Sequence, residues 1–117
     1  MRLLLIHQNF PGQFRRMAPL WAKYPNWEVL GLGRKRSQGM TDIKWVGYEL
    51  HREPDPSKQH PYLISMESAV LHGQATARAL LQLKQKGYTP DAILAHPGWG
   101  ETLYARDVFP NARLLHL

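Results

Sequence analysis

The feature that most constrains the fold of this chain is the apolar run from Leu3 to Ile6, which begins almost at the N-terminus. A strand with one solvated face alternates apolar and polar residues, whereas a continuous run is typical of a strand covered on both faces. We therefore expect a central parallel strand with helices above and below it.

Further short apolar runs predict four more strands, and helical spacing of apolar residues predicts three helices between them. The predicted strands are 28–32, 43–48, 92–95 and 112–117, and the predicted helices are 13–24, 62–86 and 100–107. Only the run at 43–48 alternates, which places it nearer a sheet edge.

This order of elements predicts a Rossmann-like, doubly wound α/β fold. We expect a mostly parallel five-stranded sheet of order 3-2-1-4-5 with helices on both faces. Ligands in such sheets bind beyond the carboxyl ends of the strands, at the point where the strand order reverses. Here that point lies between the first and fourth strands.

Two details of the helices can be checked. Pro19 falls inside the first predicted helix and should kink or shorten it. Gly73 in the long helix should mark a bend or a close packing contact. The long helix is expected to bury one broad apolar face, formed by Leu63, Met66, Val70, Ala77, Leu80 and Leu81.

The composition is that of a globular domain, with 44% hydrophobic and 21% charged residues among 117. There is no cysteine, which excludes disulfides and thiolate chemistry. No apolar run is long enough for a bilayer span or a signal peptide, so a cytoplasmic location is expected, with peripheral membrane contact left open. The net charge of +6 favours anionic partners. The one dense basic run, Arg34 to Arg36, is interpreted as a solvated loop, and nucleic acid is not expected as a partner.

Two polar, glycine-containing loops follow the first and fourth predicted strands and should meet at one edge of the sheet. The first loop contains Asn9, Pro11, Gly12 and Gln13, and the second contains His96, Gly98, Trp99, Gly100 and Glu101. Glycine allows a ligand close to the backbone, and helix N-termini attract anions. We predict these nine residues as the site, against the simpler alternative that His7 and His96 only cap strand ends.

Motifs for other chemistries are absent. The chain has no G-x-G-x-x-G after its first strand, no phosphate-binding G-x-x-x-x-G-K-[ST] and no G-x-S-x-G. None of the six histidines has the close spacing of a metal-ligand pair, so neither a metal nor a cofactor is expected. His96 is the best candidate for a catalytic side chain. Trp99 can stack on a sugar or belong to the core, and a helix-capping role is favoured for Glu101.

Several motifs resemble the N-terminal region of bacterial family 4 glycosyltransferases, ahead of their group 1 transferase domain. The opening MRLLLIHQNFPGQF is similar to the start of these enzymes, and PDAILAHPGWGETLYARDVFPNARLL at 90–115 is similar to their strand–helix–DVFP pattern. The HPYL motif at 60–63, followed by the long helix, also matches. The resemblance covers nearly the whole chain.

This resemblance implies a GT-B architecture, in which two Rossmann-like domains face each other across a cleft. Residues 1–117 would be the acceptor-side domain of a longer chain, whose C-terminal domain would bind most of the nucleotide-sugar donor. The implied activity is retaining transfer of a sugar to a sugar or lipid-linked acceptor, without a required metal. Pro11 and Gly12 would face the donor phosphates, and His96 would lie near the transferred sugar. The isolated domain is expected to be inactive.

Two other functions remain open at this point. A free-standing flavodoxin-like binding or regulatory module would share the fold, although the acidic clusters of a receiver domain are absent. A basic nucleic-acid-binding domain would depend on Arg34 to Arg36 alone. The sequence names neither the donor sugar, nor the acceptor, nor the oligomeric state.

Overall fold

The computed structural model describes residues 1–117 as one five-stranded sheet of order β3-β2-β1-β4-β5. All four neighbouring strand pairs are parallel. The strands are β1 (Arg2–Ile6), β2 (Glu28–Arg34), β3 (Lys44–Tyr48), β4 (Ala92–Ala95) and β5 (Arg113–His116). The predicted fold class and strand order are confirmed, and β3 lies at an edge as its alternating pattern indicated.

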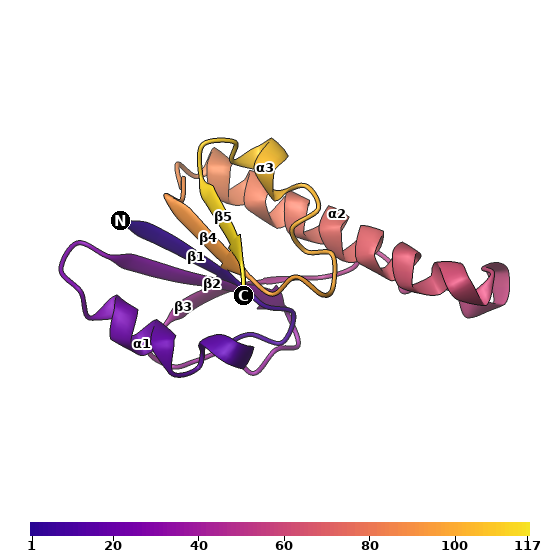
Figure 1. Ribbon diagram of the computed structural model, residues 1–117, viewed down its shortest axis with the longest axis horizontal. Helices are drawn as coiled ribbons and strands as arrows, with labels where there is room; N and C mark the ends of the chain where they lie inside the picture. The colour runs from indigo at the N-terminus through magenta and orange to yellow at the C-terminus, as the bar shows by residue number, and fades with distance from the viewer.

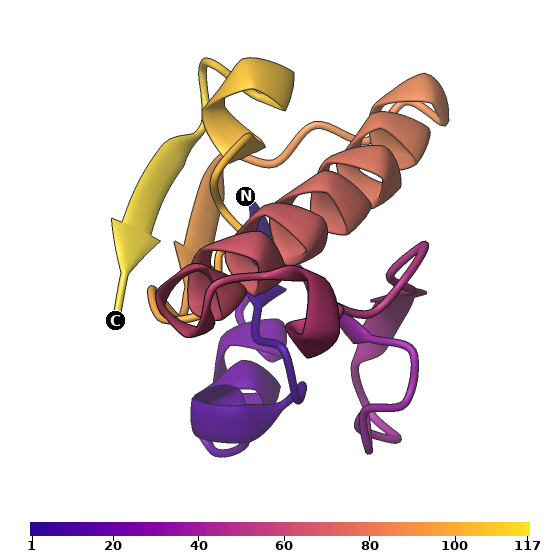
Figure 2. The same ribbon diagram turned by 90° about the vertical axis from the view of Figure 1, so that its right-hand side faces the viewer.

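The central strand β1 is buried on both faces, as its continuous apolar run predicts. Leu4 and Ile6 belong to a core cluster on the side of α2 (Ile64–Gln85) and α3 (Ala105–Val108). Leu3 and Leu5 belong to a second cluster on the side of α1 (Met17–Ala22). Figures 1 and 2 show α1 on one face of the sheet and α2 with α3 on the other.

The first helix is shorter than predicted because of its proline. Residues 12–14 form a 3-10 turn, and α1 begins only at Met17. Pro19 thereby falls in the first turn of α1, where its missing N–H removes no hydrogen bond within the helix. The predicted shortening is confirmed, and its position is set by the proline.

The link between β2 and β3 contains no helix, although the two strands are parallel. Residues 35–43 cross the α1 face instead, where Ile43 and Met40 pack against the second core cluster. The backbone N–H of Gly39 donates to the carbonyl of Phe10 at 3.0 Å. This crossover therefore also ties the loop after β1 in place.

The long helix α2 buries a different face from the predicted one. Its buried residues are Leu71, His72, Gly73, Ala75, Thr76, Ala79 and Leu80. Of the six residues predicted for the apolar face only Leu80 is buried, and Leu63, Met66 and Leu81 are exposed. The interface instead uses small residues, which bring the helix close to the sheet.

The length of α2 explains part of this error. At about 1.5 Å per residue its 22 residues span about 33 Å, longer than strands of four to seven residues at about 3.3 Å each. Figure 1 shows the N-terminal part of α2 extending beyond the sheet. Leu63, in the turn just before α2, and Met66, in its first turn, are exposed.

Turns occupy half of the last predicted helix. Residues 101–104 form turns, and α3 itself has only four residues. The expectation that the second site loop opens a helix is therefore wrong in its detail, and the first loop opens only a three-residue 3-10 turn. Neither loop gains an appreciable helix dipole. No helix of the chain has both the length and the apolar character to cross a membrane.

Candidate functional site

The two predicted loops meet because the strands before them are paired in register. Ile6 at the end of β1 pairs with Ala95 at the end of β4. His7 and His96 are the next residues on these strands, and the N–H of His96 donates to the carbonyl of Ile6 at 3.1 Å. The sheet thus brings both histidines to the carboxyl edge, where the strand order reverses.

Each of these histidine rings is fixed by its own loop. The backbone N–H of Asn9 donates to Nδ1 of His7 at 3.0 Å. The backbone N–H of Gly98 donates to Nδ1 of His96, also at 3.0 Å. Because Nδ1 accepts in both rings, the neutral forms carry their proton on Nε2. The simpler alternative, in which both histidines cap strand ends, is therefore correct for their Nδ1 atoms. It leaves the Nε2–H of each ring as a donor.

Trp99 covers the two histidines. Its ring stacks on His96 with centroids 4.1 Å apart and meets the edge of His7 at 5.0 Å. His7 is almost fully buried. Burial lowers the pKa of His7 below 6.5, and the nearby His96 lowers it further. His7 therefore resists protonation and keeps its Nε2–H donor form at neutral pH.

Gly12 is a required glycine of the first loop. Its φ is +49°, and a Cβ there would lie 2.3 Å from the His7 ring. The backbone of the loop consequently touches the edge of that ring. The neighbouring Pro11 has a fully buried side chain, so it shapes the loop rather than presenting a surface to a ligand.

The second loop is fixed against α2 by a glycine pair. Gly100 has φ +89°, and a Cβ there would lie 2.3 Å from the carbonyl oxygen of Ala69. A Cβ on Gly73 would lie 2.8 Å from the carbonyl oxygen of Gly100. The close packing contact predicted for Gly73 is confirmed. Gly100 packs against the helix, and Gly98 is the exposed glycine of this loop.

Glu101 is buried at 2% exposure and holds the end of the second loop. The hydroxyl of Tyr48 donates to its Oε1 at 3.1 Å, while Oε2 has no partner. Burial raises the pKa of Glu101 above 4.5, which favours the neutral acid. It makes no capping bond to α3, so the favoured helix-capping role is wrong. The carboxyl group instead links the loop to β3.

A hollow of about 510 Å³ lies beside these loops. Its size falls in the range of ligand pockets, about 300–1,000 Å³. Eleven residues line it, from the loop after β1, the end of β2, the connection between β3 and α2, the N-terminal half of α2 and the loop after β4. We call it the Arg34 pocket; its polar and aromatic lining is Gln8, Arg34, Glu53, Ser65, Ser68, His72 and Trp99.

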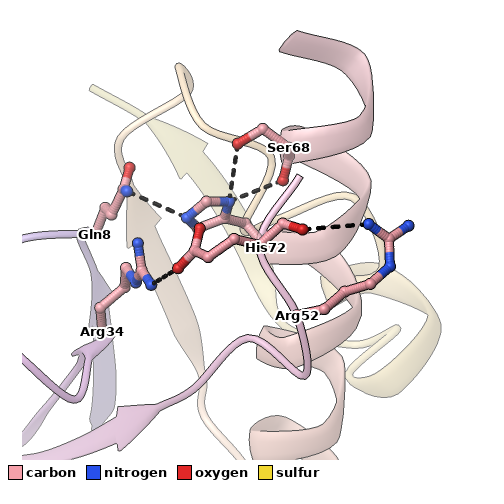
Figure 3. A network of polar contacts seen from close by, with 6 residues as sticks. Gln8, Arg34, Arg52, Ser68 and His72 are labelled. Carbon is pink, nitrogen blue, oxygen red and sulfur yellow. Dashed lines mark hydrogen bonds and ion pairs between the residues drawn. The ribbon is translucent and has the colours of Figure 1, made fainter. Parts of the chain in front are cut away.

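One wall of the Arg34 pocket is a hydrogen-bonded chain centred on a buried histidine of α2 (Figure 3). Nδ1 of His72 contacts the carbonyl oxygen of Ser68 at 2.8 Å, so this nitrogen carries a proton. In the neutral ring Nε2 then accepts from the side-chain amide of Gln8 at 3.1 Å. His72 therefore orients Gln8, the residue directly after His7.

The pocket is also lined by a guanidinium with only one partner. Nη2 of Arg34 donates to Oε1 of Glu53 at 2.9 Å, and its other side-chain N–H groups make no hydrogen bond to the protein (Figure 3). The Arg34 side chain is 11% exposed, whereas that of Glu53 is 66% exposed. The hydrogen bond from Arg34 lowers the pKa of Glu53.

The nine predicted site residues thus divide by position. Asn9, Gln13 and Gly98 are exposed, and His96, Trp99 and Gly12 are half-buried at the same edge. Gln13 donates from its amide to the carbonyl of Leu117 at 3.2 Å. The remaining three residues hold the loops from beneath; they are Pro11, Gly100 and Glu101. No three histidine or carboxylate side chains come together as a set that could hold a metal ion.

Sequence reasoning missed the Arg34 pocket. Arg34 was interpreted as part of a solvated loop, although it is the last residue of β2 and its N–H donates to the carbonyl of Gln8 at 2.9 Å. A usable signal was the polar series Ser68, His72 and Thr76. Spaced four apart on a helix, these side chains share one face, and a polar stripe within an apolar face is a sign of function.

The fold is a doubly wound α/β domain, and the candidate site lies at the switch point of its sheet. A model of the glycosyl transferase family 4 group matches residues 25–117. The chain therefore belongs to this glycosyltransferase family. The match includes β4, the loop of His96 and the whole of α2. No curated protein and no solved structure matches the chain.

Proposed function

We propose that residues 1–117 form the acceptor-side domain of a retaining glycosyltransferase of GT-B architecture. The supporting observation is the convergence of two loops at one edge: the rings of His7 and His96 lie 5.5 Å apart, and Trp99 covers both. Family membership supports glycosyl transfer as the reaction class. A nucleotide-sugar would be the donor, and a sugar or lipid-linked molecule the acceptor.

His96 is the proposed catalytic residue. Its Nδ1 is occupied by the N–H of Gly98, so its ring is oriented before any ligand arrives. In the neutral ring Nε2–H can donate to a hydroxyl or phosphate oxygen of the transferred group. Trp99 fixes the ring plane and offers an aromatic surface beside it, which suits the apolar face of a sugar.

The other site residues have supporting roles in this proposal. Gly12 allows a ligand to approach the backbone of the first loop, with Asn9 and Gln13 exposed beside it. Gly98 does the same in the second loop. The buried residues Pro11 and Glu101, together with Gly100, which packs against α2, act by holding these loops in position.

The domain is proposed to need a donor-binding partner domain of the same chain. Its edge presents two histidines and an aromatic ring, and the resemblance to family 4 enzymes implies that a second domain holds most of the donor opposite them. We expect residues 1–117 alone to bind ligands and to transfer no sugar. Robust turnover by this fragment with any nucleotide-sugar would refute the half-site proposal.

The decisive experiment uses the natural protein that contains residues 1–117. Transfer from a panel of nucleotide-sugars is measured for the wild type, His96→Ala and His60→Ala. The control is matched because Nδ1 of His60 also accepts from a backbone N–H, that of Tyr62 at 3.2 Å. We expect His96→Ala to lower kcat by roughly 10²-fold or more and His60→Ala to leave it unchanged.

The stereochemistry is tested separately by NMR of the product. Retention predicts that the new glycosidic bond keeps the anomeric configuration of the donor. An inverted product would contradict the retaining mechanism, and equal rates for His96→Ala and wild type would contradict the role of His96.

A further inference from the structure

The Arg34 pocket contains a charged group whose hydrogen-bonding capacity is mostly unused. A guanidinium has five N–H donors in a planar fork. Arg34 uses one of them on Glu53, and its side chain is 11% exposed. Burying a charge with few partners is unfavourable, which makes this cation a strong binding group for a suitable ligand.

The partner of Arg34 is held weakly. Glu53 lies on the irregular connection between β3 and α2, and its side chain is 66% exposed. Exposed ion pairs contribute little, because water competes for both charges. Glu53 is also the only acidic residue among those that line the pocket. A carboxylate or phosphate that enters the pocket can therefore replace it at Arg34.

The remaining walls suit an oxyanion with further polar groups. The hydroxyls of Ser65 and Ser68 line the pocket, and the amide of Gln8 is oriented by His72. Neutral hydroxyl and amide donors extend the donor set that Arg34 begins. Arg34 is the one lysine or arginine among the lining residues, so its guanidinium sets the charge preference.

The position of the pocket links it to the transferase site. Trp99 lines the pocket and also stacks on His96. Gln8, which also lines the pocket, directly follows His7. A molecule bound to Arg34 would thus have its neighbouring atoms beside the loop that carries His96.

Building on the proposed function, we infer that the Arg34 pocket binds an anionic group of the acceptor, a phosphate or a carboxylate. The anion displaces Glu53 and pairs with the guanidinium of Arg34 through two N–H groups. The rest of the acceptor extends past Trp99 toward His96. Acceptors that carry such a group are accordingly preferred over neutral ones.

The experiment is an NMR titration of residues 1–117 at constant ionic strength. The probes are inorganic phosphate, a sugar phosphate, a nucleoside diphosphate and a neutral methyl glycoside. Signals of the Gln8 side-chain amide and the Trp99 indole report on the pocket. The variants are Arg34→Gln, Glu53→Gln and the control Arg113→Gln, which removes an equal charge from exposed β5 at the amino edge. Dispersed spectra verify that each variant is folded.

We expect saturable shifts with phosphate and tighter binding of the sugar phosphate. Arg34→Gln should weaken both by roughly tenfold or more, because charge-assisted hydrogen bonds are lost. Glu53→Gln should strengthen binding severalfold by removing the internal competitor. Arg113→Gln should leave it unchanged.

Four results would overturn the inference. Phosphate shifts that persist in Arg34→Gln would show generic attraction to the basic surface, and an unimproved Glu53→Gln would contradict the displacement. A nucleoside diphosphate that binds this pocket more tightly than the sugar phosphate would assign the anion to the donor. Binding of the neutral glycoside alone, indifferent to Arg34→Gln, would remove the anion preference while leaving the acceptor-side function standing.

Discussion

His7 and His96 are held by the same local contact on neighbouring strands: each Nδ1 accepts a 3.0 Å hydrogen bond from the backbone N–H two residues further on. Their ring centroids lie 5.5 Å apart. The pairing of Ile6 with Ala95 produces this symmetry, because each histidine directly follows one of those residues. Two strands distant in sequence thereby place two equivalent donors at the switch point.

This arrangement predicts the titration of His7. Burial first, and the charge of His96 second, lower its pKa below 6.5. In His96→Gln we expect the pKa of His7 to rise part of the way back, as burial remains. NMR titration of the His7 Cε1–H signal measures this directly. An unchanged His7 pKa in His96→Gln would contradict the coupling.

The lowered pKa of His7 also predicts how the stability of the protein depends on pH. Below pH 6.5 the unfolded chain protonates His7 while the folded chain does not, so this residue lowers the free energy of unfolding as the pH falls. His7→Gln should flatten that part of the stability curve. Chemical denaturation between pH 7 and pH 5 provides the measurement; equal slopes for both proteins would be contrary to the shift.

Gly12→Ala should destabilise the protein and move His7. The left-handed φ of +49° alone costs a non-glycine residue about 1–2 kcal/mol, and the new Cβ would overlap the imidazole ring. Gly87→Ala is the control, because Gly87 has φ +90° and open space around it. We expect a larger loss of unfolding free energy for Gly12→Ala, together with a shift of the His7 ring signals. Equal losses of unfolding free energy in Gly12→Ala and Gly87→Ala would show that the His7 ring moves aside at no cost in stability.

Glu101→Gln should change how stability depends on pH. Burial raises the pKa of Glu101, so between 4.5 and the folded-state value the unfolded chain ionises first and wild-type stability falls as pH rises. Glu101→Gln lacks this loss, so its free energy of unfolding should increase relative to that of the wild type as the pH rises. Glu53 has a lowered pKa, so Glu53→Gln should show the opposite trend. Denaturation curves at several pH values measure this. If the unfolding free energies of wild type and Glu101→Gln changed in parallel with pH, the raised pKa of Glu101 would be contradicted.

Gly73→Ala tests the packing of the second loop on α2. Alanine in a helix interior normally gains about 1 kcal/mol over glycine. Here the added Cβ would lie 2.8 Å from the carbonyl oxygen of Gly100, so we expect a net loss of about 1–2 kcal/mol. The neighbouring exposed position provides the control Gln74→Ala, which should be nearly neutral. A stabilised Gly73→Ala would show that the loop moves freely.

The sheet could be predicted from the sequence because its signals are local. The unbroken run of Leu3 to Ile6 requires cover on both faces, and the alternation at 43–48 indicates an edge strand. The loop pair followed from the strand order alone. The register of Ile6 and Ala95 then determined which residues of those loops face each other.

The buried face of α2 could not be predicted, because the helix has more apolar residues than can pack against the sheet. Leu63 and Met66, at its N-terminal end, are exposed, while Ala75 and Ala79 are buried in the core. The Arg34 pocket depends on long-range contacts between β2, the connection after β3 and α2. No short stretch of sequence contains those contacts, although the polar stripe through His72 points to them.

The most direct test of the shared crevice is an amide NMR titration of residues 1–117 with nucleotide-sugars and candidate acceptors. The account predicts that the signals of Gly12 and Gly98 shift together, with one dissociation constant, and that His96→Ala weakens both equally. Independent titration of the two loops would contradict it, as would binding confined to the hollow at the amino edge lined by Glu28, Lys44 and Tyr88.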